Sequence, residues 1–186
     1  MIAAPIRLNL AVRLAREDDI PELKDLVAQA VRQLMRNDYT PRQIESALVH
    51  LLGIDSRLIE DGTYYLAEVG DRIAGAGGWS RRKAIYGHDA TPNPEAEQFL
   101  DPLIDAARIR AYFVHPDFAR QGIARQLLQV SEAAARASGF WKAELVATWT
   151  GVPVYESAGY TGVEPIEVTL PDGVSLTGLR MMKMLY

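Results

Sequence analysis

The chain has 186 residues, 48% of them apolar, and a formal net charge of −4. A chain of this length and apolar content can bury one sizeable core, so we expect a single domain over residues 1–186. Its acidic balance argues against a general nucleic-acid binder, which needs a basic face to displace the counterions of phosphates.

The absence of cysteine excludes disulfides, thiolate nucleophiles and thiolate metal sites. The three histidines, His50, His88 and His115, do not have the spacing of metal ligands, so we predict no metal. No apolar run is long enough to span a bilayer, and nothing at the start resembles an export signal. We therefore expect no membrane association and a cytoplasmic location.

The first half of the chain reads as a strand followed by two helices. A strand is expected at about 10–15, and apolar residues at three- and four-residue steps predict a helix over about 18–35. Thr40 and Pro41 are a hydroxyl cap and a first-turn proline, which predict the start of a second helix. We expect this helix to end at Gly53.

Two strands, Tyr64 to Val69 and Arg72 to Trp79, are separated by a Gly-Asp pair and predict an antiparallel hairpin. The second strand contains the cluster Gly75–Gly78, which indicates a bulge or the close approach of another backbone or ligand. The polar, proline-bearing stretch from Arg81 to about Pro102 is expected to be a long loop with one helical turn.

A central strand is predicted over 108–114, with Ile109, Ala111 and Phe113 on one face. The amphipathic helix after it should end at Gly139, a residue suited to a left-handed cap. A strand from about 143 to 148 would then lie parallel to the central strand through a right-handed crossover. Further strands near 162–170 and 176–185 complete a mixed α/β sheet.

The segment from Tyr112 to Arg125 joins the central strand to its helix through a single glycine turn. A helix start leaves amide N–H groups without partners and carries partial positive charge, so it favours an anion. Gly122 has no Cβ to block a phosphate, and Arg120 and Arg125 flank the turn. This pattern indicates a site for a pyrophosphate, although similar junctions also occur in α/β proteins that bind nothing.

The order strand, Val-x-Pro, basic turn, Gly-x-Ala and amphipathic helix resembles the acetyl-CoA-binding motif of the GNAT superfamily of N-acetyltransferases. The block Gly151–Tyr160 is similar to the later signature of that family, a short helix with a tyrosine that ends in Gly-Tyr. Residues Val12–Asp19 resemble its opening strand and the acidic cap of its first helix. Together the three blocks span most of the chain.

The resemblance implies a GNAT-type fold, a mixed and mostly antiparallel sheet flanked by helices, in which the parallel strands at 108–114 and 143–148 splay apart. It also implies that acetyl-CoA is the co-substrate and that its pantetheine arm lies between these strands. An N–H group near Phe113 or Val114 would bond the thioester carbonyl. The implied cofactor-binding residues are Tyr112, Phe113, Val114, Ala119, Arg120, Gln121, Gly122, Ile123, Ala124 and Arg125.

Tyr155 matches the family tyrosine that protonates the departing thiolate, a transfer that the higher pKa of a phenol permits once the sulfur carries charge. Spacing alone favours a tyrosine that merely packs a short helix, and the family match is what favours the catalytic role. For the base we name Glu144, which could instead be a surface or edge carboxylate. Arg110 is predicted to hold a carboxylate or phosphate on the acceptor, and the alternative is pairing with Asp101 or Asp105.

The leading hypothesis is an N-acetyltransferase in which a small-molecule or peptide amine attacks acetyl-CoA directly in a ternary complex. The alternative is a non-catalytic acyl-CoA sensor or partner-binding domain of the same fold. A dinucleotide-dependent oxidoreductase is disfavoured, since the glycine fingerprint is missing. The resemblance implies an acceptor site shaped by the two N-terminal helices, the 81–107 loop and the last hairpin, and a homodimer is allowed but not required.

Overall fold

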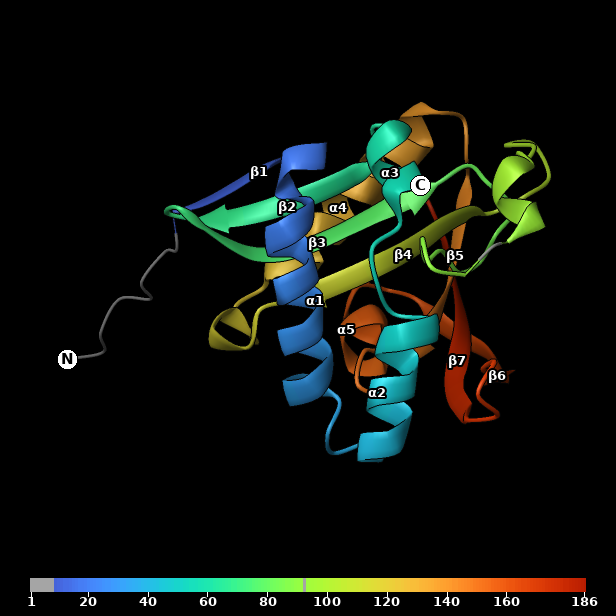
Figure 1. Ribbon diagram of the computed structural model, residues 1–186. Coiled ribbons are helices and arrows are strands. Elements are labelled where there is room, and N and C mark those ends of the chain that lie inside the picture. The colour runs from blue at the N-terminus through green and yellow to red at the C-terminus, as the bar shows by residue number, and fades with distance from the viewer. Residues whose placement is uncertain (1–8, 92) are drawn as a thin grey trace.

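The computed structural model describes residues 9–91 and 93–186, which form one seven-stranded mixed sheet with helices on both faces (Figure 1). The strands are β1 (Leu10–Leu14), β2 (Tyr64–Val69), β3 (Arg72–Ser80), β4 (Ala107–Val114), β5 (Lys142–Thr148), β6 (Thr161–Thr169) and β7 (Ser175–Met184). The helices are α1 (Ile20–Leu34), α2 (Pro41–His50), α3 (Ser56–Glu60), α4 (Ile123–Ala137) and α5 (Val152–Ser157).

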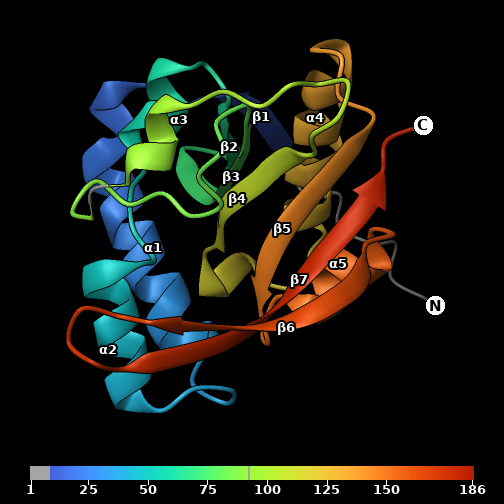
Figure 2. The same cartoon turned by 90° about the vertical axis from the view of Figure 1, so that its right-hand side faces the viewer.

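The strand order is β1-β2-β3-β4-β5-β7-β6, and the only parallel neighbours in it are β4 and β5. Helices α1 and α2 cover one face, while α4 and α5 lie on the other (Figure 2). The predicted sheet, with parallel central strands joined through α4, is therefore confirmed. Within the described residues no helix is both long enough and apolar enough to cross a membrane.

The helix signals in the sequence placed most helix starts correctly. Thr40 caps α2 by accepting a hydrogen bond from the Gln43 amide, and the Gln43 side chain bonds back to the Thr40 amide at 3.0 Å. This reciprocal pair with Pro41 in the first turn fixes where α2 begins. The helix stops at His50, three residues before the predicted end at Gly53.

Two elements of the middle region differ in how well the sequence revealed them. The helical turn predicted in the 81–102 loop is a 3₁₀ turn at Pro94–Glu97. Helix α3 was not predicted, because five residues are too few to establish a helical period. Pro92, within the predicted loop, lies outside the described residues.

The glycine cluster of β3 contains the bulge that the sequence suggested, and another backbone also approaches it closely, since a Cβ on Gly78 would stand 2.5 Å from the carbonyl oxygen of Thr63. The register between β3 and β4 shifts between Ala76 and Gly78, which is a bulge. A Cβ on Gly77 would stand 2.5 Å from the ring of Tyr112. Because glycine has no side chain, this ring can pack directly against the strand. Tyr112 is thereby held against the sheet at the start of the cofactor-binding segment predicted from the sequence.

Candidate active site

The parallel strands β4 and β5 separate soon after they meet. They pair only at Ala107 with Ala143 and at Arg108 with Glu144. From there β5 stays paired with β7 along its whole length, and β4 stays with β3. The facing edges of β4 and β5 therefore carry backbone groups that do not bond to each other, and Figure 2 shows both strands between the two layers of helices.

A bulge in β4 accompanies this separation. Ala111 has a φ of 60°, in the left-handed region that residues with a side chain rarely adopt. The bulge also breaks the predicted alternation of the strand: Ile109 packs in the cluster beneath α4, whereas Ala111 and Phe113 pack in the cluster beneath α1 and α2. The prediction that these three residues share a face is wrong because a regular period of two does not survive a bulge.

A cavity of about 700 Å³ opens between the separated strands. All of the predicted cofactor-binding residues except Gln121 line it. Gln121 instead points its side chain away to bond the carbonyl of Asp117 at 3.1 Å, closing the turn that precedes α4. Next to that turn, the N–H of His115 bonds the Ala74 carbonyl on β3 at 2.9 Å, and strand alternation then directs the Val114 N–H to the opposite edge, towards β5.

The turn Arg120–Arg125, which we call the amide turn, presents six successive backbone N–H groups. Within the described residues none of these six N–H groups has a hydrogen-bond acceptor, and no side chain caps α4. Gly122 is the N-cap with a φ of 84°, and a Cβ built on it meets nothing within 4 Å. Free amides, a helix N-terminus and open space together form a concave site suited to an anion.

Arg120 and Arg125 are exposed on either side of the amide turn and both line the cavity. The nearest acidic side chain in the sequence, Asp117, is bonded by Arg72 at 3.0 Å, and this guanidinium holds the pKa of Asp117 below its usual range. Because Asp117 is already paired, Arg120 and Arg125 are the charged side chains of this segment that remain available to a ligand at the turn. Their charge and the amides favour the same kind of ligand, a phosphate group.

Tyr155 lies on α5 and lines the cavity beyond the amide turn. Its ring contacts Tyr112 and Tyr160 edge to face, with centroid distances of 6.3 and 5.9 Å. Burial raises its pKa above the ordinary value for tyrosine, so the hydroxyl keeps its proton at neutral pH. The structure brings this protonated hydroxyl to the same cavity as the edge of β4.

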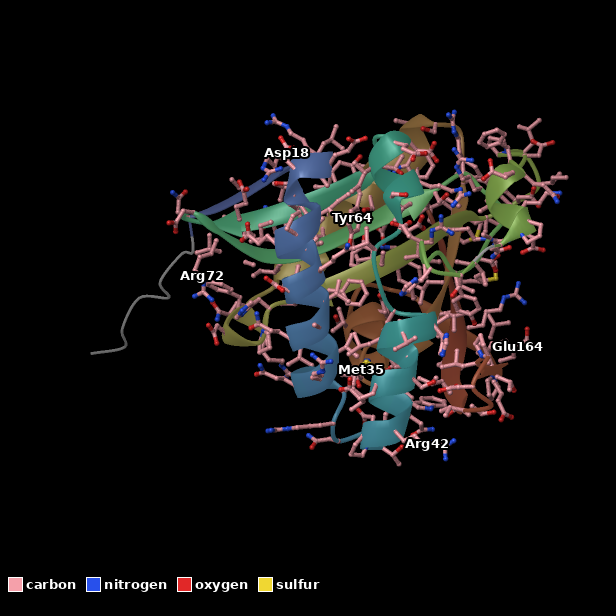
Figure 3. The ribbon with its side chains drawn as sticks, viewed as in Figure 1. Asp18, Met35, Arg42, Tyr64, Arg72 and Glu164 are labelled. Atoms are coloured by element: carbon pink, nitrogen blue, oxygen red, sulfur yellow. The ribbon has the colours of Figure 1, made fainter. Side chains whose placement is uncertain are left out.

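Glu144 does not line the cavity. It is buried where β4 and β5 begin to pair, in an ion pair with Arg108, and it accepts hydrogen bonds of 3.0 and 2.9 Å from Arg180. Arg180 also bonds Glu164, which Figure 3 shows at the outer side of the sheet on β6. The carboxylate of Glu144, which the sequence suggested as a base, is therefore already paired with two guanidinium groups.

Arg110 does line the cavity, and part of its guanidinium group is engaged elsewhere, while its Nε and Nη2 atoms are buried without a hydrogen-bond partner among the described residues. It donates to the Ala84 carbonyl at 2.7 Å and lies 2.8 Å from Asp55, and both side chains are buried. The predicted alternative partners, Asp101 and Asp105, bond within their own loop instead. Asp55 was missed because it precedes the unpredicted α3 and is 55 residues away in sequence.

The cavity continues through the sheet to the face covered by α1 and α2, where its lining becomes apolar. Figure 3 labels Met35, which lies where α1 approaches α2. We call this part the apolar end; its lining residues are Leu34, Met35, Leu51, Leu52, Ile85, Tyr86, Ile166, Val168 and Leu176. They come from the two N-terminal helices, the long loop and the last hairpin, the segments that the resemblance implied.

A second cavity of about 340 Å³ adjoins the apolar end and shares Leu51, Tyr86 and Val168 with it. We call it the side chamber. Its other lining includes His50, His88, Thr91 and Asn93, so it is more polar than the apolar end. No sequence signal pointed to it, because its residues are brought together from three distant segments.

Comparisons with known proteins agree with this architecture. A GCN5-related N-acetyltransferase from Rhodopseudomonas palustris is 18% identical with a TM-score of 0.70, and the match covers 94% of this chain and 95% of that one. YncA of Salmonella typhimurium, a putative acetyltransferase solved with acetyl-CoA, is 16% identical with a TM-score of 0.62, covering 95% and 94%. PaiA N-acetyltransferase of Thermoplasma acidophilum, in complex with coenzyme A, is 11% identical with a TM-score of 0.63, covering 94% and 98%.

At these identities the solved structures establish the fold, and no curated protein sequence matches the chain. The family model of the acetyltransferase (GNAT) domain matches residues 60–162, more than half of the chain. That segment runs from the end of α3 to the start of β6 and includes β4, the amide turn, β5 and Tyr155. The chain belongs to the GNAT acetyltransferase family.

Proposed function

We propose that the protein is an acetyl-CoA-dependent N-acetyltransferase in which an amine attacks the acetyl thioester directly within a ternary complex. The observation that carries the proposal is the amide turn, which opens into the same cavity as the separated edge of β4 and Tyr155. Along its length the cavity thus offers an anion site, then a strand edge, then a proton donor. Acetyl-CoA supplies the pyrophosphate, the pantetheine arm and the activated acetyl group that this order suits.

The residues of the chain then take distinct roles. The amides of the amide turn, with Arg120 and Arg125, bind the pyrophosphate. The N–H of Val114 faces the gap and donates to the acetyl carbonyl oxygen, which gains negative charge during attack; such a donor contributes roughly 3 to 4 kcal/mol to the transition state. Tyr155 gives its proton to the sulfur as the thiolate leaves.

Two residues suggested by the sequence are not part of this proposal. Glu144 would first have to give up its contacts with Arg108 and Arg180, and it lies outside the cavity lining. Arg110 would have to give up Asp55 before it could bind an acceptor carboxylate. A cytoplasmic location and a homodimer stay predictions.

The test is calorimetric titration of the protein with acetyl-CoA, followed by an assay for released CoA over a panel of amines. We expect micromolar binding and acetylated product identified by mass spectrometry. Binding without turnover of any amine would support the acyl-CoA sensor instead. A folded protein that binds no acetyl-CoA would overturn both functions.

A further inference from the structure

We infer that the acceptor is the uncharged α-amino group of a peptide or amino-acid amide whose first side chain is apolar. This inference rests on the proposed function, since it names the substrate class for the same cavity. Three observations support it: the apolar end is lined mainly by aliphatic side chains, no acidic side chain lines the cavity within the described residues, and a polar side chamber adjoins the apolar end.

The apolar end lies largely outside the segment that the family model matches. Residues Leu34, Met35, Leu51 and Leu52 precede that segment, while Val168 and Leu176 follow it. Most of the residues that shape this end therefore lie outside the matched segment, and only Ile85 and Tyr86 lie within it. Six aliphatic or thioether side chains facing one space favour an apolar group there.

The charged side chains of the cavity leave this end without an anion. Within residues 9–91 and 93–186 the only charged residues that line the cavity are Arg110, Arg120 and Arg125. Arg120 and Arg125 belong to the amide turn on the other face of the sheet. The Nε and Nη2 atoms of Arg110 are buried from solvent, and its nearest carboxylate, Asp55, stands behind it and behind Gly87.

Apart from the arginines, the titratable groups that line the cavity within the described residues are four tyrosines: Tyr39, Tyr86, Tyr112 and Tyr155. Burial raises the pKa of Tyr86 to about 12 and raises those of the other three as well, so all four are neutral near pH 7. The hydroxyl of Tyr39 is also occupied, since it donates to the Thr177 carbonyl at 2.7 Å and accepts from the Trp149 amide at 2.9 Å. These groups can neither balance an ammonium charge nor remove its proton.

An ammonium group that entered this space would lose its hydration without gaining an opposite charge, and the neutral amine is favoured by that difference. At pH 7 about one in seven α-amino groups is neutral, against about one in 2500 lysine side chains, from their ordinary pKa values of about 7.8 and 10.4. A cavity that accepts only the neutral amine therefore draws on a fraction that is several hundred times larger for α-amino groups than for lysine amines.

The side chamber gives the rest of such an acceptor a place to go. It shares Tyr86 with the apolar end, and its lining of His50, Thr91 and Asn93 is polar, which suits the backbone of a second and third residue. His50 lies 4.0 Å from Asp172, which also accepts a 2.7 Å bond from Ser46. His88 is engaged by the Ala90 amide and lies 3.3 Å from the Leu48 carbonyl. An apolar first residue followed by a polar chain fits both spaces.

The transfer balances without a protein base. The nitrogen lone pair forms a bond to the acetyl carbon, the carbon–sulfur bond breaks, and its electron pair leaves with sulfur. The nitrogen releases one proton to solvent water, Tyr155 gives its proton to sulfur, and solvent returns a proton to Tyr155. The only protonation that limits the step is therefore that of the free acceptor.

The test offers both amines in one molecule. With acetyl-CoA and the peptide Leu-Gly-Lys-amide, we expect fragmentation mass spectrometry to find at least 100-fold more acetyl on the α-amine than on the lysine. We expect kcat/KM to rise about tenfold per pH unit below pH 7.5. The matched peptide Asp-Gly-Lys-amide places a charge in the apolar end and should react at least tenfold more slowly.

A variant pair links this selectivity to the cavity. Met35→Glu puts a carboxylate in the apolar end and should raise the share of lysine acetylation at least tenfold, while Val49→Glu, on the exposed side of α2, should not. Preferred lysine acetylation by the unchanged protein, equal rates for the Leu and Asp peptides, or acetyl-CoA binding with no peptide acetylated would each overturn the inference. Loss of acetyl-CoA binding itself would mark failure of the proposed function, which calorimetry distinguishes.

Discussion

The guanidinium of Arg110 lies 2.8 Å from the carboxylate of Asp55, and this buried pair joins three segments of the chain around the cavity. Arg110 stands on β4, Asp55 immediately precedes α3, and the Ala84 carbonyl that accepts from Arg110 belongs to the loop that supplies Ile85 and Tyr86 to the apolar end. The pair therefore holds the wall of the apolar end in place.

We predict that Arg110→Met lowers the free energy of unfolding by about 3 to 5 kcal/mol at pH 7, because it leaves a buried carboxylate without its partner. Burial raises the pKa of Asp55, and Arg110 opposes part of that rise. Without Arg110 the pKa of Asp55 in the folded state rises further. Asp55 then stays protonated in the folded variant at pH values where the same carboxyl in the unfolded chain, with a pKa of about 3.9, has already ionised. Urea unfolding should show a deficit that grows as pH rises from about 4 to 7.

The double variant Asp55→Asn with Arg110→Met is the control for this prediction. It lacks both charges, so its deficit relative to the unchanged protein should be smaller at pH 7 and should vary less with pH. A deficit of Arg110→Met that stays constant from pH 4 to 7 would contradict a coupled pair.

The sequence predicted those parts of the site that depend on local signals. The amide turn follows from a glycine placed between a strand and an amphipathic helix, and the start of α2 follows from Thr40 and Pro41. A short-range pattern suffices there because the backbone geometry is decided within a few residues.

Other parts of the site depend on long-range contacts that no local pattern shows. The pair of Arg110 with Asp55 and the double pairing of Glu144 join residues from separate elements, and the bulge at Ala111 reverses the face of β4 midway along the strand. A regular alternation assigned Arg110 and Tyr112 to one face, whereas Tyr112 packs beneath α4 and Arg110 pairs on the other side. Only the fold shows which charges are already satisfied.

Removing either arginine of the amide turn should weaken cofactor binding through charge. We predict that Arg120→Ala and Arg125→Ala each raise the Kd for acetyl-CoA about tenfold, equivalent to about 1.4 kcal/mol, and that the loss shrinks in high salt because both side chains are exposed. Arg42→Ala is the matched control, since Figure 3 shows Arg42 at the outer end of α2. Calorimetry at 50 and 500 mM salt checks this; equal effects of all three substitutions would exclude a specific role for the turn.

Gly122→Glu should abolish acetyl-CoA binding, with the Kd raised at least 100-fold, because the added carboxylate projects into the space in front of the free amides and repels phosphate. Gly173→Glu is a control for backbone strain. Gly173 has a φ of 80°, close to the 84° of Gly122, and a Cβ there also meets nothing within 4 Å, but it lies in the turn between β6 and β7. Both variants should lose similar stability in thermal unfolding, and retained binding by Gly122→Glu would remove the amide turn from the cofactor site.

Tyr155→Phe tests the proton donor while the packing stays in place. The ring contacts with Tyr112 and Tyr160 persist in phenylalanine, so we expect unchanged acetyl-CoA affinity, little change in stability, and a kcat about 100-fold lower. Because burial raises the pKa of Tyr155, the rate of the unchanged protein should not fall through tyrosine ionisation below about pH 10.

Tyr160→Phe removes a buried hydroxyl that has no hydrogen-bond partner among the described residues, and it should leave kcat within about twofold. Steady-state assays at saturating acetyl-CoA separate the two: equal losses of kcat would show that the aromatic cluster, rather than the Tyr155 hydroxyl, supports the reaction.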